Sequence, residues 1–147
     1  MSLLEVSGLK KVYKTRFGGN AVEALRNVNF SVNEGEYVAI MGESGSGKTT
    51  LLNILAALDK PTAGTVLLDG RDFTKIRESE AATFRRDHLG FVFQEFNLLD
   101  TFTLEDNIYL PLVLAGKSYD EMRTRLIDIA ETLGIRELLK KYPYEVS

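Results

Sequence analysis

Residues 42–49, Gly42-Glu43-Ser44-Gly45-Ser46-Gly47-Lys48-Thr49, are the stretch that most strongly determines the expected fold of this chain. They match the pattern G-x-x-x-x-G-K-[ST] at every fixed position. A short apolar run, residues 37–41, precedes them, and an apolar segment of helical character, residues 48–58, follows. Together these segments predict a buried strand, a glycine-rich loop and a helix that begins inside the loop.

A loop of this kind suits the binding of phosphate groups. Glycine allows the backbone to turn successive N–H groups inward, which makes a concave site for phosphate oxygens. The N-terminus of the following helix adds partial positive charge at the same place. A glycine- and serine-rich turn that only caps a helix is the alternative, but the order of strand, loop and helix favours a phosphate site. We therefore expect the loop to bind a nucleoside triphosphate.

Each residue of the loop has an expected role. Lys48 would place its ammonium group against the β- and γ-phosphates, where it reduces their mutual repulsion. The Thr49 hydroxyl is a hard oxygen ligand that suits Mg²⁺, and the Thr50 hydroxyl would reach the α-phosphate. The other predicted nucleotide-binding residues form the concave backbone: Gly42, Glu43, Ser44, Gly45, Ser46 and Gly47.

Outward from the loop, the pattern of apolar residues predicts a mixture of strands and helices. Strands are expected at residues 3–13, 22–32, 37–41, 65–68 and 89–93, and helices at residues 48–58, 78–87, 103–115, 118–133 and 135–141. The third and fifth strands are almost wholly apolar, which is typical of strands buried on both faces of a parallel sheet. The first two strands have no helix between them and would form an antiparallel flank. The expected fold is therefore α/β with a partly parallel central sheet.

Length and composition limit the classes of protein to consider. A chain of 147 residues, 44% hydrophobic and 27% charged, is sufficient for one soluble domain with a hydrophobic core. It has no apolar run of about 20 residues, which a transmembrane helix needs, and no signal-peptide pattern at its N-terminus. The net charge of −3, without a long basic block, argues against nucleic acid as a partner. The lack of cysteine excludes disulfides and suits a cytoplasmic protein.

Four further segments resemble the nucleotide-binding subunit of ATP-binding cassette (ABC) transporters. They are Gly35-Glu36-Tyr37-Val38-Ala39-Ile40-Met41, Leu51-Leu52-Asn53-Ile54-Leu55, Pro61-Thr62-Ala63-Gly64 and Phe91-Val92-Phe93-Gln94. The resemblance extends over essentially the whole chain. It implies a phosphate-loop NTPase fold in which residues 1–147 form one ATP-binding domain, with residues 1–93 as its core and residues 94–147 as a helical subdomain. The ligands that it implies are ATP and Mg²⁺.

The resemblance also assigns roles to two residues outside the loop. Tyr13 matches the family's N-terminal aromatic residue, which stacks on adenine, and a flat π face suits a purine. The alternatives are an ordinary strand aromatic at this position and a role for nearby Phe17. Gln94 matches the glutamine whose amide oxygen binds Mg²⁺ or holds the attacking water, which makes it a metal ligand with Thr49 and a catalytic residue with Lys48. A loop glutamine that bonds only to the backbone is the alternative for Gln94.

The segments that follow Gln94 resemble one subgroup of the family. Phe96-Asn97-Leu98-Leu99 and Tyr109-Leu110-Pro111-Leu112 are similar to subunits for bacterial lipoprotein release, macrolide export and bacitracin-type peptide resistance. This resemblance implies a membrane permease as a partner, received in an apolar groove. It also implies a second ATP-binding subunit and a peripheral position on the cytoplasmic face of the membrane. Plain core packing of a helical subdomain is the alternative for these apolar residues.

Three parts that the family uses to hydrolyse ATP are not found: a signature loop beginning Ser-Gly-Gly-Gln, a strand ending in Asp-Glu and a later histidine. Residues 142–147 resemble the lead-in to the signature, and the chain ends on its serine. Asp69 is expected in a turn, His88 in a structural or surface position and Asp128 on a solvated helix face, so none is a substitute. We therefore expect a truncated, N-terminal fragment that binds Mg-ATP without appreciable hydrolysis and self-associates through exposed sheet edges.

Other classes of protein fit the sequence less well. A GTPase would need a guanine-reading Asn-Lys-x-Asp element, which the chain lacks. A kinase would normally carry an arginine-rich lid, and the pair Arg85-Arg86 is too small to indicate one. A non-catalytic ATP-sensing or interaction module is the alternative function. The function that the resemblance implies for the whole subunit is to power the export or extraction of a peptide, drug or lipoprotein.

Overall fold

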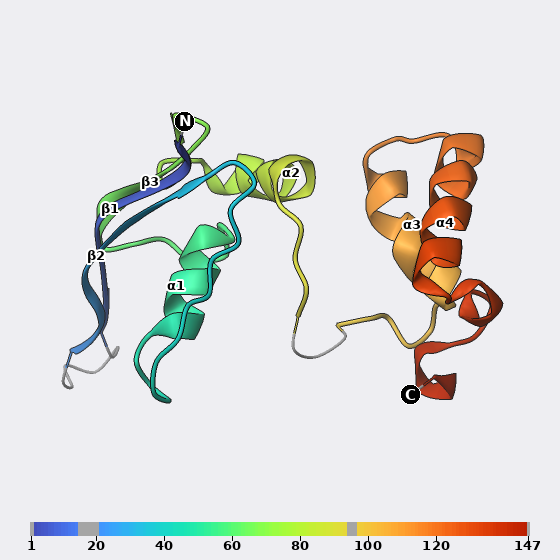
Figure 1. Cartoon of the computed structure of the whole chain (residues 1–147), viewed down its shortest axis with the longest axis horizontal. Helices are drawn as coiled ribbons and strands as arrows, with labels where there is room; N and C mark the ends of the chain where they lie inside the picture. Colours follow the sequence, from blue (N-terminus) through green and yellow to red (C-terminus); the bar gives the residue numbers. More distant parts are fainter. Residues whose placement is uncertain (1, 15–20, 94–96, 147) are drawn as a thin grey trace. The chain divides into compact units, whose positions relative to one another are not determined.

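The computed structural model describes residues 2–14, 21–93 and 97–146. The chain divides into two compact units, Met1–Phe91 and Val92–Ser147, each of which has its own internal packing (Figure 1). The strands and two helices belong to the first unit, and the second unit is helical. The predicted glycine-rich loop therefore lies within the first unit.

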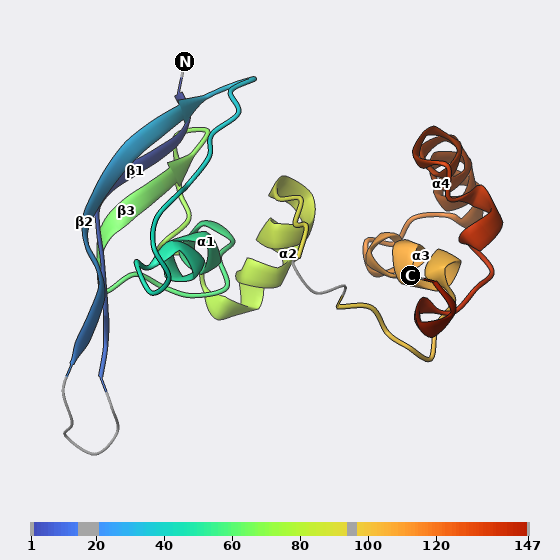
Figure 2. The same ribbon diagram turned by 60° about the horizontal axis from the view of Figure 1, so that its bottom comes forward.

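An antiparallel sheet forms one layer of the first unit. Its strands, in the spatial order β2-β1-β3-β4, are β1 (Ser2–Tyr13), β2 (Val22–Asn33), β3 (Ala63–Leu68) and β4 (Arg71–Asp72). Figure 2 shows β1 between β2 and β3. In this register Val6 lies opposite Phe30 on one side and Val66 on the other. The predicted antiparallel pairing of the first two strands is confirmed.

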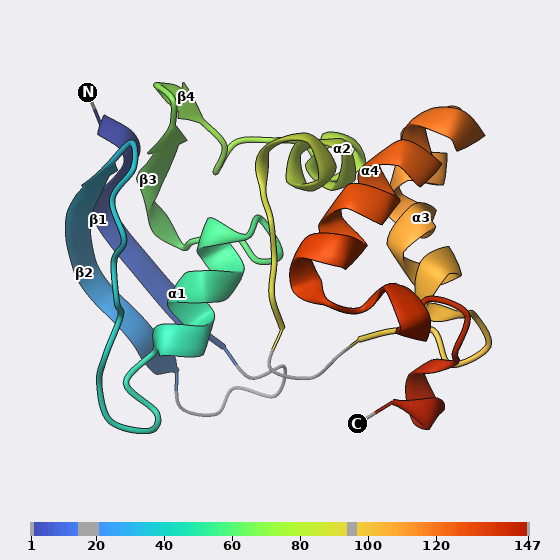
Figure 3. The same ribbon diagram turned by 45° about the vertical axis from the view of Figure 1, so that its right-hand side comes forward.

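Two helices, α1 (Lys48–Leu55) and α2 (Glu78–His88), complete the first unit. Figure 3 shows α1 beside one face of the sheet, and α1 buries Leu51 and Ile54 in the core. The rings of Phe73 and Phe84 join α2 to this core, with their centroids 5.1 Å apart. The buried residues of the core are all apolar: Val6, Leu9, Leu25, Leu51, Ile54, Val66, Phe73, Ile76, Ala81 and Phe84.

Two segments that were expected to be buried strands are irregular. Residues 37–41 and 89–93 are not in strand conformation, and Tyr37 and Val92 are each 98% exposed. A strand needs neighbouring strands to satisfy its backbone hydrogen bonds, and among the described residues the sheet is formed by β1, β2, β3 and β4. The strand pairs of the described chain are therefore all antiparallel, and the prediction of strands at these two places is wrong for this structure.

Helix α1 also ends earlier than predicted, at Leu55 rather than at residue 58. Ala57 has a φ of 53°, in the left-handed region, and Leu58 N donates to the carbonyl of Asn53, five residues earlier. This turn stops the helix and directs the following loop towards β1, where Thr62 N donates to the carbonyl of Lys10 at 2.8 Å.

The second unit contains α3 (Leu104–Leu114) and α4 (Tyr119–Leu133), followed by the 3₁₀ turns η1 (Arg136–Leu138) and η2 (Pro143–Glu145). Helix α3 begins with a reciprocal cap, because the Thr103 hydroxyl accepts from Asp106 N and the Asp106 carboxylate accepts from Thr103 N. Aspartate thus occupies the position that glutamate or glutamine usually takes in such a cap. The helix expected over residues 135–141 is only the short turn η1.

A separate apolar core holds the second unit together. Its buried residues are Tyr109, Met122, Leu126, Ala130 and Leu139. Three of these lie on α4 at spacings of four residues, which places them on one helical face. The described residues include no helix that is long and apolar enough to span a bilayer.

Candidate functional site

The glycine-rich loop has the backbone conformation that its sequence suggests. Gly45 and Gly47 have φ values of 81° and 92°, in the region that favours glycine. A Cβ at Gly47 would lie 2.4 Å from the carbonyl oxygen of Ala24 on β2, so this position admits only glycine without movement of the backbone. Gly47 is also the N-cap of α1 and provides no side-chain cap. The cap residue therefore provides no side-chain acceptor for the first N–H groups of α1, and these groups are available as donors to a ligand.

The Lys48 ammonium group lies inside the loop. Its Nζ donates to the carbonyl oxygens of Gly42 at 2.8 Å and Glu43 at 2.6 Å, and to the Ser46 hydroxyl at 3.3 Å. These contacts bring the beginning and the end of the predicted loop together around one positive charge. Such a charge next to the N-terminus of a helix favours an anionic ligand.

A hollow of about 550 Å³ lies beside the loop and the start of β2. Six of the predicted nucleotide-binding residues line it: Ser44, Gly45, Gly47, Lys48, Thr49 and Thr50. The other three loop residues, Gly42, Glu43 and Ser46, are contacts of Lys48. Three residues of β2 also line the hollow: Val22, Glu23 and Ala24. The lining thus combines backbone donors, three hydroxyl side chains and one cation from the loop with a short segment of β2.

Glu23 is a residue of the hollow that the sequence did not single out. Its carboxylate accepts from Lys10 Nζ at 2.9 Å and lies 3.4 Å from Arg26 Nε. The hydrogen bond from Lys10 lowers the pKa of Glu23, and the charges of Lys10 and Arg26 add to this effect. A carboxylate that is paired and acidic in this way is a weak base. Only the strand pairing, which is not visible in the linear sequence, places Glu23 beside the loop.

Tyr13, the predicted adenine-stacking residue, is the last residue of β1 and lies opposite Val22 in the register of β1 and β2. Directly opposed residues of an antiparallel pair have their side chains on the same face of the sheet. Val22 lines the hollow, whereas Tyr13 is not among the residues that line it. The Tyr13 hydroxyl donates to Asp59 Oδ2 at 2.9 Å, and its side chain is 42% exposed. The alternative aromatic, Phe17, lies outside the described residues.

Gln94, the predicted second metal ligand and catalytic residue, also lies outside the described residues. Across the described ranges 2–14, 21–93 and 97–146, His, Asp and Glu side chains form no group of three or more that could hold a metal ion. Mg²⁺ commonly binds through one or two side chains together with substrate phosphates. Thr49 lines the hollow, and its hydroxyl fits this mode of Mg²⁺ binding.

The three polar residues that were set aside as substitutes behave as expected. Asp69 is in the turn between β3 and β4 with a φ of 48°. His88 ends α2, where its ring packs 5.0 Å from that of Phe84. Asp128 is on the exposed face of α4. None of the three lines the hollow beside the loop.

The loop, the helix that begins in it and the antiparallel flank define a protein of the phosphate-loop NTPase class. The family model for the ABC transporter matches residues 25–147, which is more than half of the chain. The chain therefore belongs to the ABC transporter family, and the resemblance found in the sequence is confirmed.

Individual relatives agree with the family. ABC transporter ATP-binding protein YvcR of Bacillus subtilis (strain 168) is 48% identical over 100% of this chain and 57% of its own length. The bacitracin export ATP-binding protein BceA of Halalkalibacterium halodurans is 44% identical with the same coverage. A solved dimeric structure of the ATP-binding cassette MJ0796 in a post-hydrolysis state, bound to ADP and Pi, has 38% identity and a TM-score of 0.87. The match covers 98% of this chain and 63% of the MJ0796 chain. This similarity confirms the mixed α/β fold class.

Proposed function

We propose that this chain is the nucleotide-binding part of an ABC transporter ATPase subunit and that it binds Mg-ATP in the hollow beside residues 42–50. The observation that carries the proposal is the position of Lys48, whose ammonium group is enclosed by the loop at the N-terminus of α1. This is an arrangement of charge and backbone donors suited to phosphate. The relative solved with ADP and Pi supports the choice of nucleotide.

The residues around the hollow would divide the nucleotide between them. Lys48 would hold the β- and γ-phosphates once its contacts with the loop carbonyls are exchanged for phosphate oxygens. Thr49 would supply a hydroxyl to Mg²⁺ and Thr50 a hydroxyl to the α-phosphate. Tyr13 would stack on the adenine at the strand side of the hollow. Gln94 is proposed, from the family resemblance, to complete the Mg²⁺ shell and to hold the attacking water.

For the whole protein, we propose a cycle in which ATP brings two such subunits together and hydrolysis separates them. The chain spans 57% of the length of the curated relatives described above, and the cycle is proposed for a whole subunit. The subunit would act on a membrane permease from the cytoplasmic face and power the export or extraction of a peptide, drug or lipoprotein. The dimeric cassette and the bacitracin export relative support this proposal.

The 147-residue chain by itself is proposed to bind ATP without turnover. In-line attack on the γ-phosphate needs a group that positions and polarises water. Among the described residues that line the hollow, Glu23 is the one carboxylate. Its ion pairs with Lys10 and Arg26 lower its pKa and occupy its oxygens.

Titration of the chain with Mg-ATP, by calorimetry and with a phosphate-release assay in parallel, tests both statements. Lys48→Ala should weaken ATP binding about 10- to 100-fold, because a charge-assisted contact of about 1.5–3 kcal/mol is lost. Lys75→Ala is the matched control, since Lys75 is an exposed lysine paired with Asp72 and does not line the hollow. Equal affinity in Lys48→Ala and wild type would remove the proposed phosphate site. If the wild-type chain releases phosphate and Lys48→Ala abolishes that release, the chain hydrolyses ATP and the proposal of binding without turnover is refuted.

A further inference from the structure

The carboxylate of Asp59, in the loop after α1, joins that loop to the end of β1. Its Oδ1 accepts from Lys11 Nζ at 2.6 Å and its Oδ2 from the Tyr13 hydroxyl at 2.9 Å. The backbone N–H of Lys60 also donates to Oδ1, at 2.7 Å, and Lys11 Nζ donates to the carbonyl of Lys60 at 2.7 Å. Both oxygens of Asp59 are therefore used, and two of their three donors are side chains of β1.

This ion pair is less exposed than a typical surface pair. The side chains of Lys11 and Asp59 are 13% and 29% exposed, whereas those of Lys10 and Glu23 are 43% and 37% exposed. Burial raises the pKa of Asp59, but the hydrogen bonds from Lys11, Tyr13 and Lys60 outweigh it and hold the pKa below the ordinary value. Asp59 therefore stays ionised at neutral pH, and the pair has a fixed geometry.

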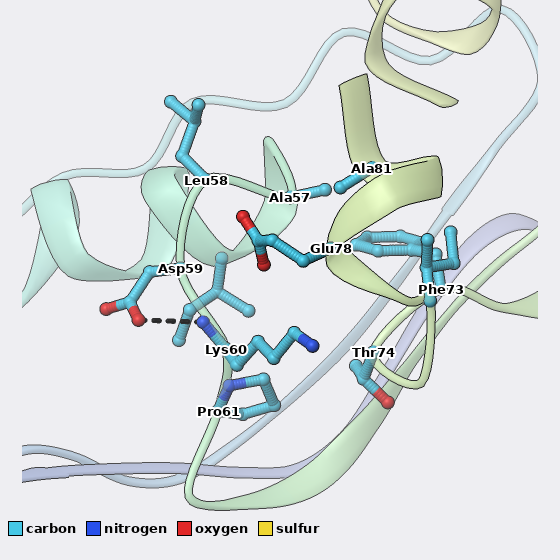
Figure 4. Close-up of a pocket in the computed structure, with 11 residues that line it drawn as sticks. Ala57, Leu58, Asp59, Lys60, Pro61, Phe73, Thr74, Glu78 and Ala81 are labelled. Carbon is cyan, nitrogen blue, oxygen red and sulfur yellow. Dashed lines mark hydrogen bonds between the residues drawn. The ribbon is translucent and has the colours of Figure 1, made fainter. Parts of the chain in front are cut away.

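The lysine at the next position does not compete for this carboxylate. Figure 4 shows the Lys60 side chain extending towards Thr74, away from the Asp59 carboxylate, while the backbone N–H of Lys60 makes the dashed contact with Asp59. The side-chain cation at Asp59 is thus Lys11, which comes from β1. The same loop is attached to β1 a second time, because the Thr62 hydroxyl accepts from Val12 N at 2.9 Å.

Lys11 also acts on the ring of Tyr13. Its Nζ lies 4.9 Å from the ring centroid, which is within the range of a cation–π interaction. The hydroxyl of the same ring is held by Asp59. Two contacts, one on a ring face and one at the ring's polar end, thus fix the orientation of Tyr13. With the ammonium group over one face, the opposite face is the one available for stacking on a flat ligand.

We propose that Asp59, through its ion pair with Lys11 and its hydrogen bond to Tyr13, is a positioning residue for recognition of the nucleotide base. It presents one face of the Tyr13 ring to the adenine at the strand side of the hollow. This inference rests on the proposed binding of Mg-ATP. Because Asp59 holds the base-recognising residue and not the phosphate loop, its loss should affect only ligands that carry a base.

The experiment compares two ligands, Mg-ATP and inorganic tripolyphosphate with Mg²⁺, in calorimetric titrations of the 147-residue chain. Asp59→Asn keeps the shape of the side chain but removes its charge. We expect it to weaken ATP binding about 3- to 10-fold, a part of the roughly 5- to 150-fold that loss of one base–aromatic stack produces, and to leave tripolyphosphate binding unchanged. Tyr13→Ala should give the larger loss for ATP alone. Asp72→Asn is the control, because Asp72 also accepts from a lysine and a threonine, but these are Lys75 and Thr74 and not Tyr13.

A double-mutant cycle separates positioning from a general effect on stability. If Asp59 acts through the Tyr13 ring, Asp59→Asn should have no further effect on ATP binding in a Tyr13→Ala background. Equal losses for ATP and tripolyphosphate, or additive losses in the double variant, would overturn the proposal. If the wild-type chain binds tripolyphosphate as tightly as ATP, the base contributes no affinity. That result would also overturn the proposal, but it would leave the proposed phosphate site standing. Failure of the wild type to bind either ligand would instead reject the proposed function itself, and this inference with it.

Discussion

At the scale of single residues, the glycines of the loop were predictable because their requirement is local. Gly47 must adopt a positive φ and begin a helix within a motif of eight residues, and its sequence neighbours show this. Glu23 and Asp59 were not predictable in the same way. The Asp59 contact with Lys11 joins residues 48 positions apart, and the place of Glu23 beside the loop depends on how β2 approaches α1. Neither relation leaves a pattern in the linear sequence.

The two kinds of constraint at Gly47 lead to a prediction. In Gly47→Ala, the alanine would have to adopt a φ of 92°, and its Cβ would lie only 2.4 Å from the carbonyl oxygen of Ala24. Gly35→Ala has a similar φ of 79° but no atom within 4 Å of its Cβ. Strain of this kind costs about 1–3 kcal/mol, so we expect Gly35→Ala to show that loss in urea unfolding and Gly47→Ala to exceed it. Gly47→Ala should also lose Mg-ATP binding, whereas Gly35→Ala should retain it. Similar unfolding free energies for the two variants would show that the backbone contact with β2 is not restrictive.

At the scale of elements, the sequence predicted those whose signals are contained within the element. The alternation of β1 and β2 and the helical spacing of α4 are local signals, and these elements form close to their expected bounds. Residues 37–41 and 89–93 have apolar sequences that equally suit a strand. They remain irregular because a strand is completed by neighbouring strands, and the sheet of the described residues is formed by β1, β2, β3 and β4. The early end of α1 at Leu55 was also missed, because the left-handed residue there is alanine and not glycine.

The cap of α3 gives a prediction at this scale. Thr103→Ala removes the hydroxyl that accepts from Asp106 N and that donates to the Asp106 carboxylate at 2.6 Å. Loss of such a cap costs about 1 kcal/mol, so we expect the second unit to unfold at lower urea concentration in circular dichroism at 222 nm. Thr124→Ala is the matched control, since the Thr124 hydroxyl only donates to the Asp120 carbonyl within α4. An equal shift in both variants would assign the effect to threonine removal in general and not to the cap.

At the scale of the whole chain, the sequence predicted both the family and the phosphate loop. The comparisons confirm the family. What the sequence could not supply is the surface that results when predicted strands do not form. Tyr37, Met41 and Val92 are 98%, 88% and 98% exposed. These residues belong to runs with apolar and β-branched side chains that are not in strand conformation. Such segments are suited to pairing with the same segment of another molecule.

We therefore predict that the isolated chain self-associates through these runs. In multi-angle light scattering, the weight-average mass should rise with protein concentration for the wild type. Val92→Lys should reduce this rise, because a charge within the run disfavours strand pairing between molecules. Leu133→Lys is the matched control: Leu133 is 65% exposed, but it lies on α4, where the backbone is already hydrogen-bonded within the helix. A mass of one chain at all concentrations would contradict the prediction. An equal effect of the two lysines would show that exposed apolar area, and not the strand-forming sequence of these runs, causes the association.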